Sequence, residues 1–249
     1  MILRNSFRRM AAALACAGAA VILLLAGPAA TAQSLAVLPV NILFSAGQKA
    51  SSLTVTNKGT SETAIQIRAF AWTQTDNDDQ LTESDAVVLS PPLATIAPGA
   101  SQVVRLILRQ LPQGREATYR ILIDQIPPPA EPGMVHMVLR MSIPIFADPP
   151  TRAVPHMQFH LDVDSGKLVL VGINDGLSHE VIRDVVLTTS DGRKLKGDSS
   201  ASPYILAGVT HRWTVATEGP LPLPGQTMQL TAHTDAGVIQ QQVGFVTAP

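Results

Sequence analysis

The sequence predicts an all-β protein made of two immunoglobulin-like β-sandwich domains in series. Short segments alternate between apolar and polar side chains, which is the period of a β-strand, and turn-forming residues interrupt them about every 8 to 12 residues. No apolar stripe of helical period extends over a useful length in the first half of the chain. The segment Ala147-Asp-Pro-Pro-Thr151 divides the chain in two and is typical of a hinge between domains.

The first 32 residues predict a secretory signal peptide. Arg4, Arg8 and Arg9 precede an apolar run from Met10 to Gly27, and the small residues Ala30-Thr-Ala32 provide a cleavage site. The alternative is a retained membrane anchor, because the apolar run approaches the length that spans a bilayer. The position of the small residues directly after the run favours cleavage and export to an oxidising space.

The composition that remains after this cleavage excludes several classes of protein. Three of the 18 basic residues lie in the signal segment, so 15 remain against 19 acidic residues, a net charge of −4, which does not favour nucleic acid or anionic lipid as a partner. The only cysteine, Cys16, lies in the apolar run behind a poor lipidation signal, so we expect no disulfide and no thiolate metal site. No later apolar run is long enough for membrane insertion of the mature chain.

The first domain is expected over residues 33–147. Its expected strands are Gln33–Phe44, Ala50–Thr56, Glu62–Thr73, Ala86–Leu89, Gln102–Arg109, Ala117–Ile126 and Met134–Phe146. Pro39 favours an edge position for the first strand, because proline has no backbone donor. The polar segment Thr75–Gln80 is interpreted as a solvated loop, because its acidic residues lack the spacing of an EF-hand.

The second domain is expected over residues 152–249. Its expected strands are Gln158–Asp164, Lys167–Asn174, Val181–Thr188, Tyr204–Ala207, His211–Thr217, Met228–Thr234 and Gly237–Val246. Turn sequences such as Asn174-Asp-Gly176 and Ser190-Asp-Gly192 separate them.

The segment Met134–Phe146 predicts one strand of about twice the usual length. One face of it is wholly apolar and carries Val135, Met137, Leu139, Met141, Ile143 and Ile145. Pro144 places the end of this strand at the rim of a sheet, where a long apolar edge without charge is an aggregation hazard. The edge is therefore expected to have a partner; the alternative is an ordinary core strand of the sandwich.

No catalytic or metal-binding constellation emerges from the sequence. His156 and His160 would lie roughly 13 Å apart in a strand, too far to share a metal ion. Asp124 is interpreted as a surface carboxylate of an alternating strand, and none of the common catalytic or phosphate-binding motifs is present. We expect no enzyme activity and no cofactor.

Several segments, in order, resemble the periplasmic chaperones of chaperone–usher pilus assembly, and in particular the branch that assembles archaic, spore-coat-U-type pili. They are Ile65-Gln-Ile-Arg-Ala-Phe-Ala-Trp72, Ser90-Pro-Pro-Leu93, Ile96-Ala-Pro-Gly99, Val104-Arg-Leu106, Tyr119-Arg-Ile-Leu-Ile-Asp124-Gln-Ile-Pro127 and Ser142-Ile-Pro-Ile-Phe-Ala147, with a looser match at Leu168–Gly176. The segment Pro127–Gly133 is short, as in the short-loop chaperones.

The resemblance implies an L-shaped pair of immunoglobulin-like domains that binds pilin subunits in the periplasm and delivers them, without ATP, to an outer-membrane usher. Such a chaperone donates its G1 strand to a subunit that lacks its last strand. With Phe146 placed on the family's terminal aromatic residue, the resemblance assigns subunit binding to Val135, Met137, Leu139, Met141 and Ile143. The alternative function is a structural or adhesive secreted protein with two such domains, either a pilus subunit or a carbohydrate-binding module.

One departure from the family concerns the anchor for the subunit's C-terminal carboxylate. Many members use an arginine in the first strand and a lysine on G1, where this chain has Asn41 and Pro144. Arg140, Arg68 and Arg120 are the candidate replacements; alternatively, they are ordinary surface or sheet-edge arginines.

Overall fold

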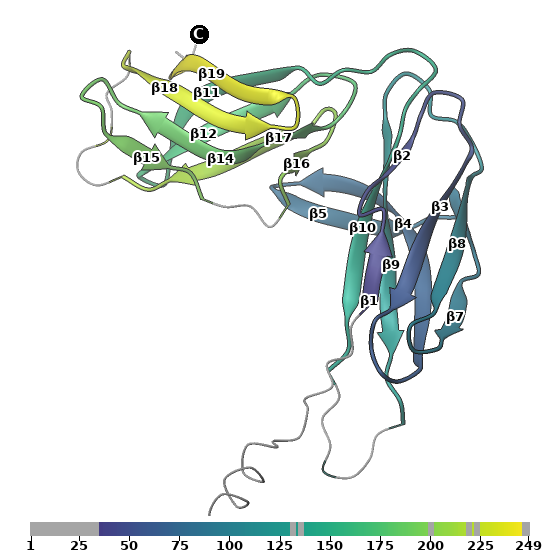
Figure 1. Cartoon of the computed structure of the whole chain (residues 1–249). Coiled ribbons are helices and arrows are strands. Elements are labelled where there is room, and N and C mark those ends of the chain that lie inside the picture. The colour runs from purple at the N-terminus through teal and green to yellow at the C-terminus, as the bar shows by residue number, and fades with distance from the viewer. Residues whose placement is uncertain are drawn as a thin grey trace, which may run out of the picture.

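The structure is a computed structural model of the chain. It describes residues 35–129, 133, 137–198, 202–217, 221 and 225–245. These residues form two immunoglobulin-like sandwiches arranged as an L, and no helix among them is long and apolar enough to cross a membrane (Figure 1). The predicted all-β class and two-sandwich architecture are confirmed. The predicted signal peptide, residues 1–32, lies outside the described residues.

The N-terminal sandwich contains strands β1 to β10. They are β1 (Leu35–Leu38), β2 (Ile42–Phe44), β3 (Ala50–Asn57), β4 (Thr63–Thr75), β5 (Asp78–Glu83), β6 (Val87–Ser90), β7 (Leu93–Ile96), β8 (Ser101–Leu108), β9 (Ala117–Ile126) and β10 (Arg140–Ala147). One sheet has the order β1-β3-β8-β6, and the other has the order β2-β10-β9-β4-β5, with β7 also paired to β4. Alternate side chains of both sheets meet in one core, where Val55, Ile65 and Val104 are fully buried.

The first predicted strand, Gln33–Phe44, is wrong as a single element. Within it, β1 pairs with β3 in one sheet and β2 pairs in parallel with β10 in the other. Pro39 lies between the two short strands and has no N–H to donate to a ladder, so the strand is interrupted there. The chain thereby closes one side of the sandwich with two short strands instead of one long strand.

The predicted loop Thr75–Gln80 is also corrected, because it contains a tight turn and the start of a strand. Asp76 and Asn77 have φ angles of 52° and 70°, a left-handed conformation that these two residue types tolerate, and β5 then pairs with β4. All six residues of β5 are exposed, so no apolar alternation marks this strand in the sequence.

The C-terminal sandwich contains strands β11 to β19. They are β11 (Met157–Asp164), β12 (Lys167–Asn174), β13 (Glu180–Val181), β14 (Arg183–Thr188), β15 (Lys194–Lys196), β16 (Tyr204–Ile205), β17 (Thr210–Val215), β18 (Thr227–Thr234) and β19 (Gly237–Gly244). Three strands form the sheet β11-β12-β17, four form the sheet β15-β14-β18-β19, and β13 pairs with β16. The two larger sheets enclose a second core that includes the fully buried Leu170, Leu187 and Leu230.

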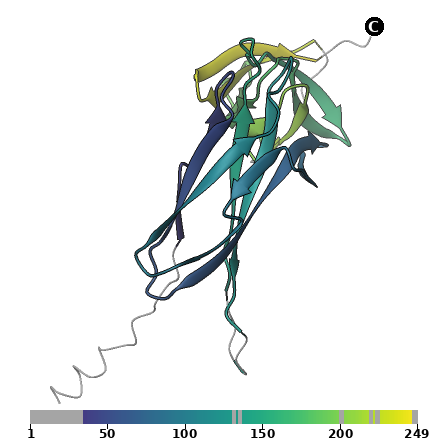
Figure 2. The ribbon, with the colours of Figure 1, turned by 90° about the vertical axis from the view of Figure 1, so that its right-hand side faces the viewer.

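The two sandwiches meet at one end of the N-terminal domain, as the perpendicular view shows (Figure 2). The turn between β4 and β5 reaches the C-terminal domain, where the Asn77 side chain donates a hydrogen bond to the Arg212 carbonyl and accepts one from the Arg212 N–H. The Gln74 side chain likewise bridges to the backbone of Tyr204 and Leu206. These hydrogen bonds, from side chains of the N-terminal domain to the backbone of the C-terminal domain, fix the orientation of the two domains.

Candidate functional site

The backbone of β10 is paired on both sides at its C-terminal end and on one side at its N-terminal end. From Arg140 to Ala147 it pairs with β9, whereas β2 covers only Ile145–Ala147. Along Arg140–Pro144 the outer edge therefore has no neighbouring strand among the described residues. Pro144 lies at the end of this open section, as predicted for a proline at a sheet edge.

The predicted strand Met134–Phe146 is too long, because the described residues 137–139 precede the observed strand; residues 134–136 lie outside the described residues. The ladder begins at Arg140, and the hydrogen bond from the Gln125 N–H to the Leu139 carbonyl, 2.9 Å long, is the last backbone bond before it. In the same register Met137 would lie opposite Pro127, the first of three consecutive prolines. Prolines have no N–H to donate, so β9 offers this part of the chain no ladder.

The apolar face of β10 emerges gradually from the core of its own domain. Ile145 is fully buried, Ile143 is 6% exposed and Met141 is partly buried against the same core. Further out, Leu139 is 43% exposed and Met137 is 91% exposed. A row of apolar side chains thus continues from the interior of the sandwich into solvent along an open strand edge.

Two of the five predicted binding residues are not part of the exposed row that the structure describes. Ile143 belongs to the core of the N-terminal domain and presents little surface to a partner, because the sheet β1-β3-β8-β6 covers this part of the row. Val135 lies outside the described residues. Met137, Leu139 and Met141 therefore form the described part of the face, which we call the β10 apolar face.

Arg68 and Arg140 share a single carboxylate on the opposite face of the sheet. Asp124 of β9 accepts hydrogen bonds from Arg68 of β4, at 2.8 Å, and from Arg140 of β10. Burial by itself would raise the pKa of the Asp124 carboxyl, but the hydrogen bonds from the two arginines outweigh it and hold that pKa below its ordinary value. Two cations on one anion leave an excess positive charge, and the Arg140 side chain is 63% exposed.

Arg120 lies in the cleft between the domains and has partners of its own. Its guanidinium is 3.1 Å from the Asp79 carboxylate and lies 3.7 Å from the centre of the Trp72 ring. Burial lowers its pKa and nearby Asp79 counteracts part of that shift. A second bond to Ser202 reaches the C-terminal domain, so Arg120 is placed to hold the domains together.

The two positions that carry the family's anchor are neighbours in this fold. Ile42 pairs with Ile145, so the preceding residues, Asn41 and Pro144, lie side by side. Neither residue carries a positive charge, and Arg120 pairs with Pro144 from the other side. The three candidate arginines therefore do not form one cluster. Arg120 faces the cleft between the domains, whereas Arg68 and Arg140 form salt bridges with Asp124.

The buried end of β10 takes part in an aromatic joint between the domains. The Phe146 ring stacks on His179 with 3.5 Å between ring centres and packs against Trp72 and Tyr204. His179 in turn donates to the buried Glu116 carboxylate at 2.8 Å. The strand that carries the apolar face thus also anchors the second domain.

Sequence reasoning missed this joint. Its members are Trp72, Glu116, Phe146, His179, Tyr204 and Leu206. Their positions span both halves of the chain, and no local period connects them. The available signal was the scarcity of large aromatic side chains, because Trp72 and Tyr204 belong to the 4% of residues that are aromatic.

Similar folds occur among solved pilus chaperones. The chain superposes with a TM-score of 0.63 and 21% identity on a chain of the CsuC–CsuE chaperone–tip adhesion subunit pre-assembly complex from the archaic chaperone–usher Csu pili of Acinetobacter baumannii, covering 85% of this chain and 98% of that chain. The YadV chaperone matches with a TM-score of 0.62 and 16% identity over 85% of this chain and 99% of its own. At these identities the likeness concerns the fold.

Two curated proteins that are similar in sequence are also chaperones. The chain is 31% identical over 134 residues to the chaperone protein FimB/FhaD of Bordetella pertussis, covering 51% of this chain and 52% of that protein. It is 29% identical over 126 residues to the chaperone protein LpfB of Salmonella typhimurium, covering 50% and 52%. The chain thus spans about half the length of these curated relatives. Residues 34–152 match the family described as pili and flagellar-assembly chaperone, PapD N-terminal domain, so the N-terminal sandwich carries the domain that defines this family of pilus-assembly chaperones.

Proposed function

We propose that this protein is a periplasmic chaperone that binds pilin subunits through β10 and delivers them to an outer-membrane usher. The observation that carries the proposal is the open edge of β10, from which the β10 apolar face extends into solvent. The solved complex of CsuC with the tip subunit CsuE provides a precedent for a chaperone of this fold holding a subunit. The role is binding and release, without catalysis.

The open edge offers a client both of the interactions that donor-strand complementation requires. Unpaired backbone groups along Arg140–Pro144 can pair with a strand of the client, and alternate side chains can enter the groove of its incomplete sandwich. Met137 would contribute about 1.5 to 3 kcal/mol on full burial, and Leu139, which is only 43% exposed, about half as much, before the cost of association. Two methionines in the row suit client grooves of different shape, because the methionine side chain is flexible.

Arg140 is the best placed of the three arginines to replace the missing carboxylate anchor. It lies on the open edge, its side chain is 63% exposed, and it shares its carboxylate partner with Arg68. Arg120 is 11% exposed and occupied by Asp79 and Trp72. Unchanged client binding in alanine variants of all three arginines would exclude the anchor.

The proposal includes the boundaries of the mature protein and its compartment. A signal peptide of residues 1–32 would be removed on export, leaving domains of residues 33–147 and 152–249 in the periplasm. The alternative of a structural or adhesive protein is less well supported, because the matched relatives are described as chaperones.

The test is co-expression in the periplasm with candidate pilin subunits encoded by neighbouring genes. A subunit should co-purify with the wild-type protein, and Leu139→Asp should reduce that capture about 100-fold or more, because a carboxylate in an apolar groove is strongly disfavoured. Leu139 is half exposed, so the variant should fold like the wild type, as circular dichroism would check.

The matched control is Leu93→Asp, which places the same charge on a 57% exposed leucine of β7. β7 pairs with β4, away from β10, so capture should be unchanged. Equal capture by the wild type and a folded Leu139→Asp variant would refute subunit binding through this face.

A further inference from the structure

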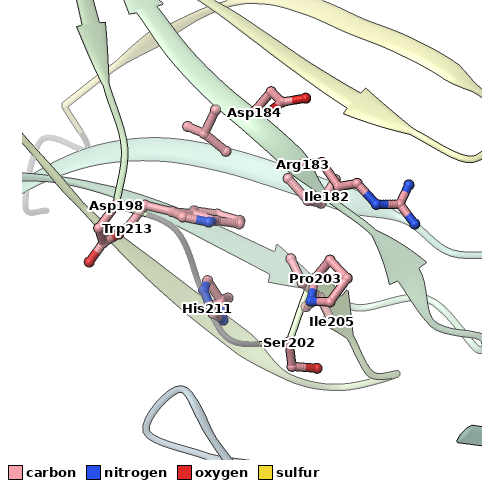
Figure 3. A pocket seen from close by; sticks show the side chains of 10 residues that line it. Ile182, Arg183, Asp184, Asp198, Ser202, Pro203, Ile205, His211 and Trp213 are labelled. Atoms are coloured by element: carbon pink, nitrogen blue, oxygen red, sulfur yellow. The ribbon is translucent and has the colours of Figure 1, made fainter. Parts of the chain in front are cut away.

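The C-terminal domain contains an apolar cavity of about 310 Å³ beside the interdomain cleft (Figure 3). Ile182, Val185, Pro203, Ile205 and Trp213 supply its apolar walls. This volume lies at the lower end of the range for small-molecule sites, about 300 to 1000 Å³. A dry apolar cavity of about 150 Å³ already binds benzene in another protein. One substituted aromatic ring would therefore fit.

A buried histidine gives this cavity its polar group. His211 of β17 is 4% exposed, and its imidazole makes no hydrogen bond to any described residue. Its ring contacts the Trp213 ring with 4.5 Å between their centres. Neither ring nitrogen is among the fully buried side-chain atoms without a partner, so the imidazole opens into the cavity, where it can bond the polar group of a ligand.

The charge around His211 restricts the ligand. Burial lowers the pKa of His211, although Asp198 and Asp79 counteract part of that shift, so the ring is neutral at pH 7 and offers one donor and one acceptor. The cavity rim also carries Asp184 and Arg183, and Arg183 is paired with Asp235. Acidic groups near a neutral imidazole disfavour an anionic ligand.

We propose that this cavity binds one neutral aromatic ring that bears a hydroxyl or N–H group, with Trp213 contacting the ring and His211 bonding the polar atom. The site lies in the other domain from the β10 apolar face and does not rest on the proposed chaperone function.

Two sources can supply such a ring. The cavity shares Asp198, Ser202 and His211 with a second cavity of about 480 Å³ that Ser142 of β10 and Arg120 also line. A tyrosine or tryptophan side chain of a protein held at β10 could therefore enter from the cleft. A free phenol or indole could enter by the same route.

The test uses the purified exported protein labelled with ¹⁵N and titrated with p-cresol. The chain has two tryptophans, so the indole signal of Trp213 reports on the cavity and that of Trp72 serves as an internal control. We expect a saturable shift of the Trp213 signal and a smaller one at Trp72, which contacts Arg120 in the wall of the second cavity. Toluene should bind about tenfold more weakly than p-cresol because it leaves His211 unpartnered, and benzoate should bind more weakly still because it is charged.

Substitution of His211 tests its role directly. His211→Phe keeps a ring of similar shape and should weaken p-cresol about tenfold, whereas the matched control His156→Phe, on an exposed histidine outside the cavity, should not. If His211→Phe does not fold, the ratio of p-cresol to toluene affinity in the wild type decides the question. No saturable shift at Trp213, or equal affinity for toluene and p-cresol, would overturn the proposal.

The same titration on a complex with a captured subunit distinguishes the two sources. Loss of p-cresol binding in that complex supports a subunit side chain as the occupant, and unchanged binding excludes it and leaves a free small molecule as the source.

Discussion

At its C-terminal end β10 has a strand on each side, whereas at its N-terminal end it has a strand on one side only. Both ends carry the same apolar alternation. Ile145 is fully buried in the core of its own domain, but Met137, which continues the same alternation three residues before β10 begins, is 91% exposed. The difference lies in the neighbours of the strand and not in the side chains.

An apolar alternation along a strand carries limited information about what covers the strand. It identifies a face that will be covered by protein, because exposed apolar rows along a strand edge are an aggregation hazard. It does not indicate whether the covering atoms belong to the same chain. Before the section that β2 covers, the exposed fraction rises from 6% at Ile143, through the partly buried Met141, to 43% at Leu139 and 91% at Met137.

The largest loss of stability is expected at the buried C-terminal end of β10. Phe146→Ala should lower the free energy of unfolding by about 3 to 5 kcal/mol, because it removes a buried ring packed against Trp72 and His179. Urea unfolding measures the loss, and small-angle scattering should show a wider distribution of interdomain orientations. A variant as stable as the wild type, with the same scattering curve, would show that the aromatic joint does not hold the domains together.

A paired substitution on the apolar face sharpens the contrast between the two ends. Ile145→Ala should cost about 2 to 5 kcal/mol of stability, whereas Met137→Ala should stay within about 0.5 kcal/mol. Subunit capture should show the opposite preference, with Met137→Ala weakening it in a protein of unchanged stability. Similar losses of stability in both variants would contradict the distinction between the buried end of the apolar row, at Ile145, and its exposed end, at Met137.

Most of the fold could be predicted from local pattern. The strands with one buried face, such as β3, β8 and β18, follow the alternation in the sequence closely. The failures have physical causes: β5 is exposed on both faces, and the segment Gln33–Phe44 is divided because its two parts pair with different sheets.

The candidate site could be predicted only in part, because long-range pairing decides it. The alternation predicted a row of apolar side chains, and the structure leaves Met137 and Leu139 of that row exposed. It could not show that Ile143 is covered by the facing sheet or that Pro127 ends the ladder opposite Met137. The cavity around His211 gave no sequence signal, because its lining comes from the three strands β14, β16 and β17 and from the segments between strands.

The smallest loss of stability is expected from the charged residues at the start of the β10 ladder, where Asp124 forms salt bridges with both Arg140 and Arg68. Asp124→Asn should lower stability at pH 7 by about 1 kcal/mol or less, because partly exposed ion pairs contribute little. The folded-state pKa of Asp124 lies below its ordinary value, so this contribution is fully present above about pH 5 and is lost as the pH falls through the folded pKa. Urea unfolding of wild type and variant between pH 7 and pH 2 should therefore give two curves that converge in acid.

Asp85→Asn is the matched control for this titration, because Asp85 is 87% exposed and lies 3.8 Å from Arg109. Its stability should follow the wild type at every pH. If Asp124→Asn also followed the wild type throughout, the charges would not help to set where β10 begins. The position of the open edge would then depend on backbone geometry alone, with the prolines after β9 as its cause.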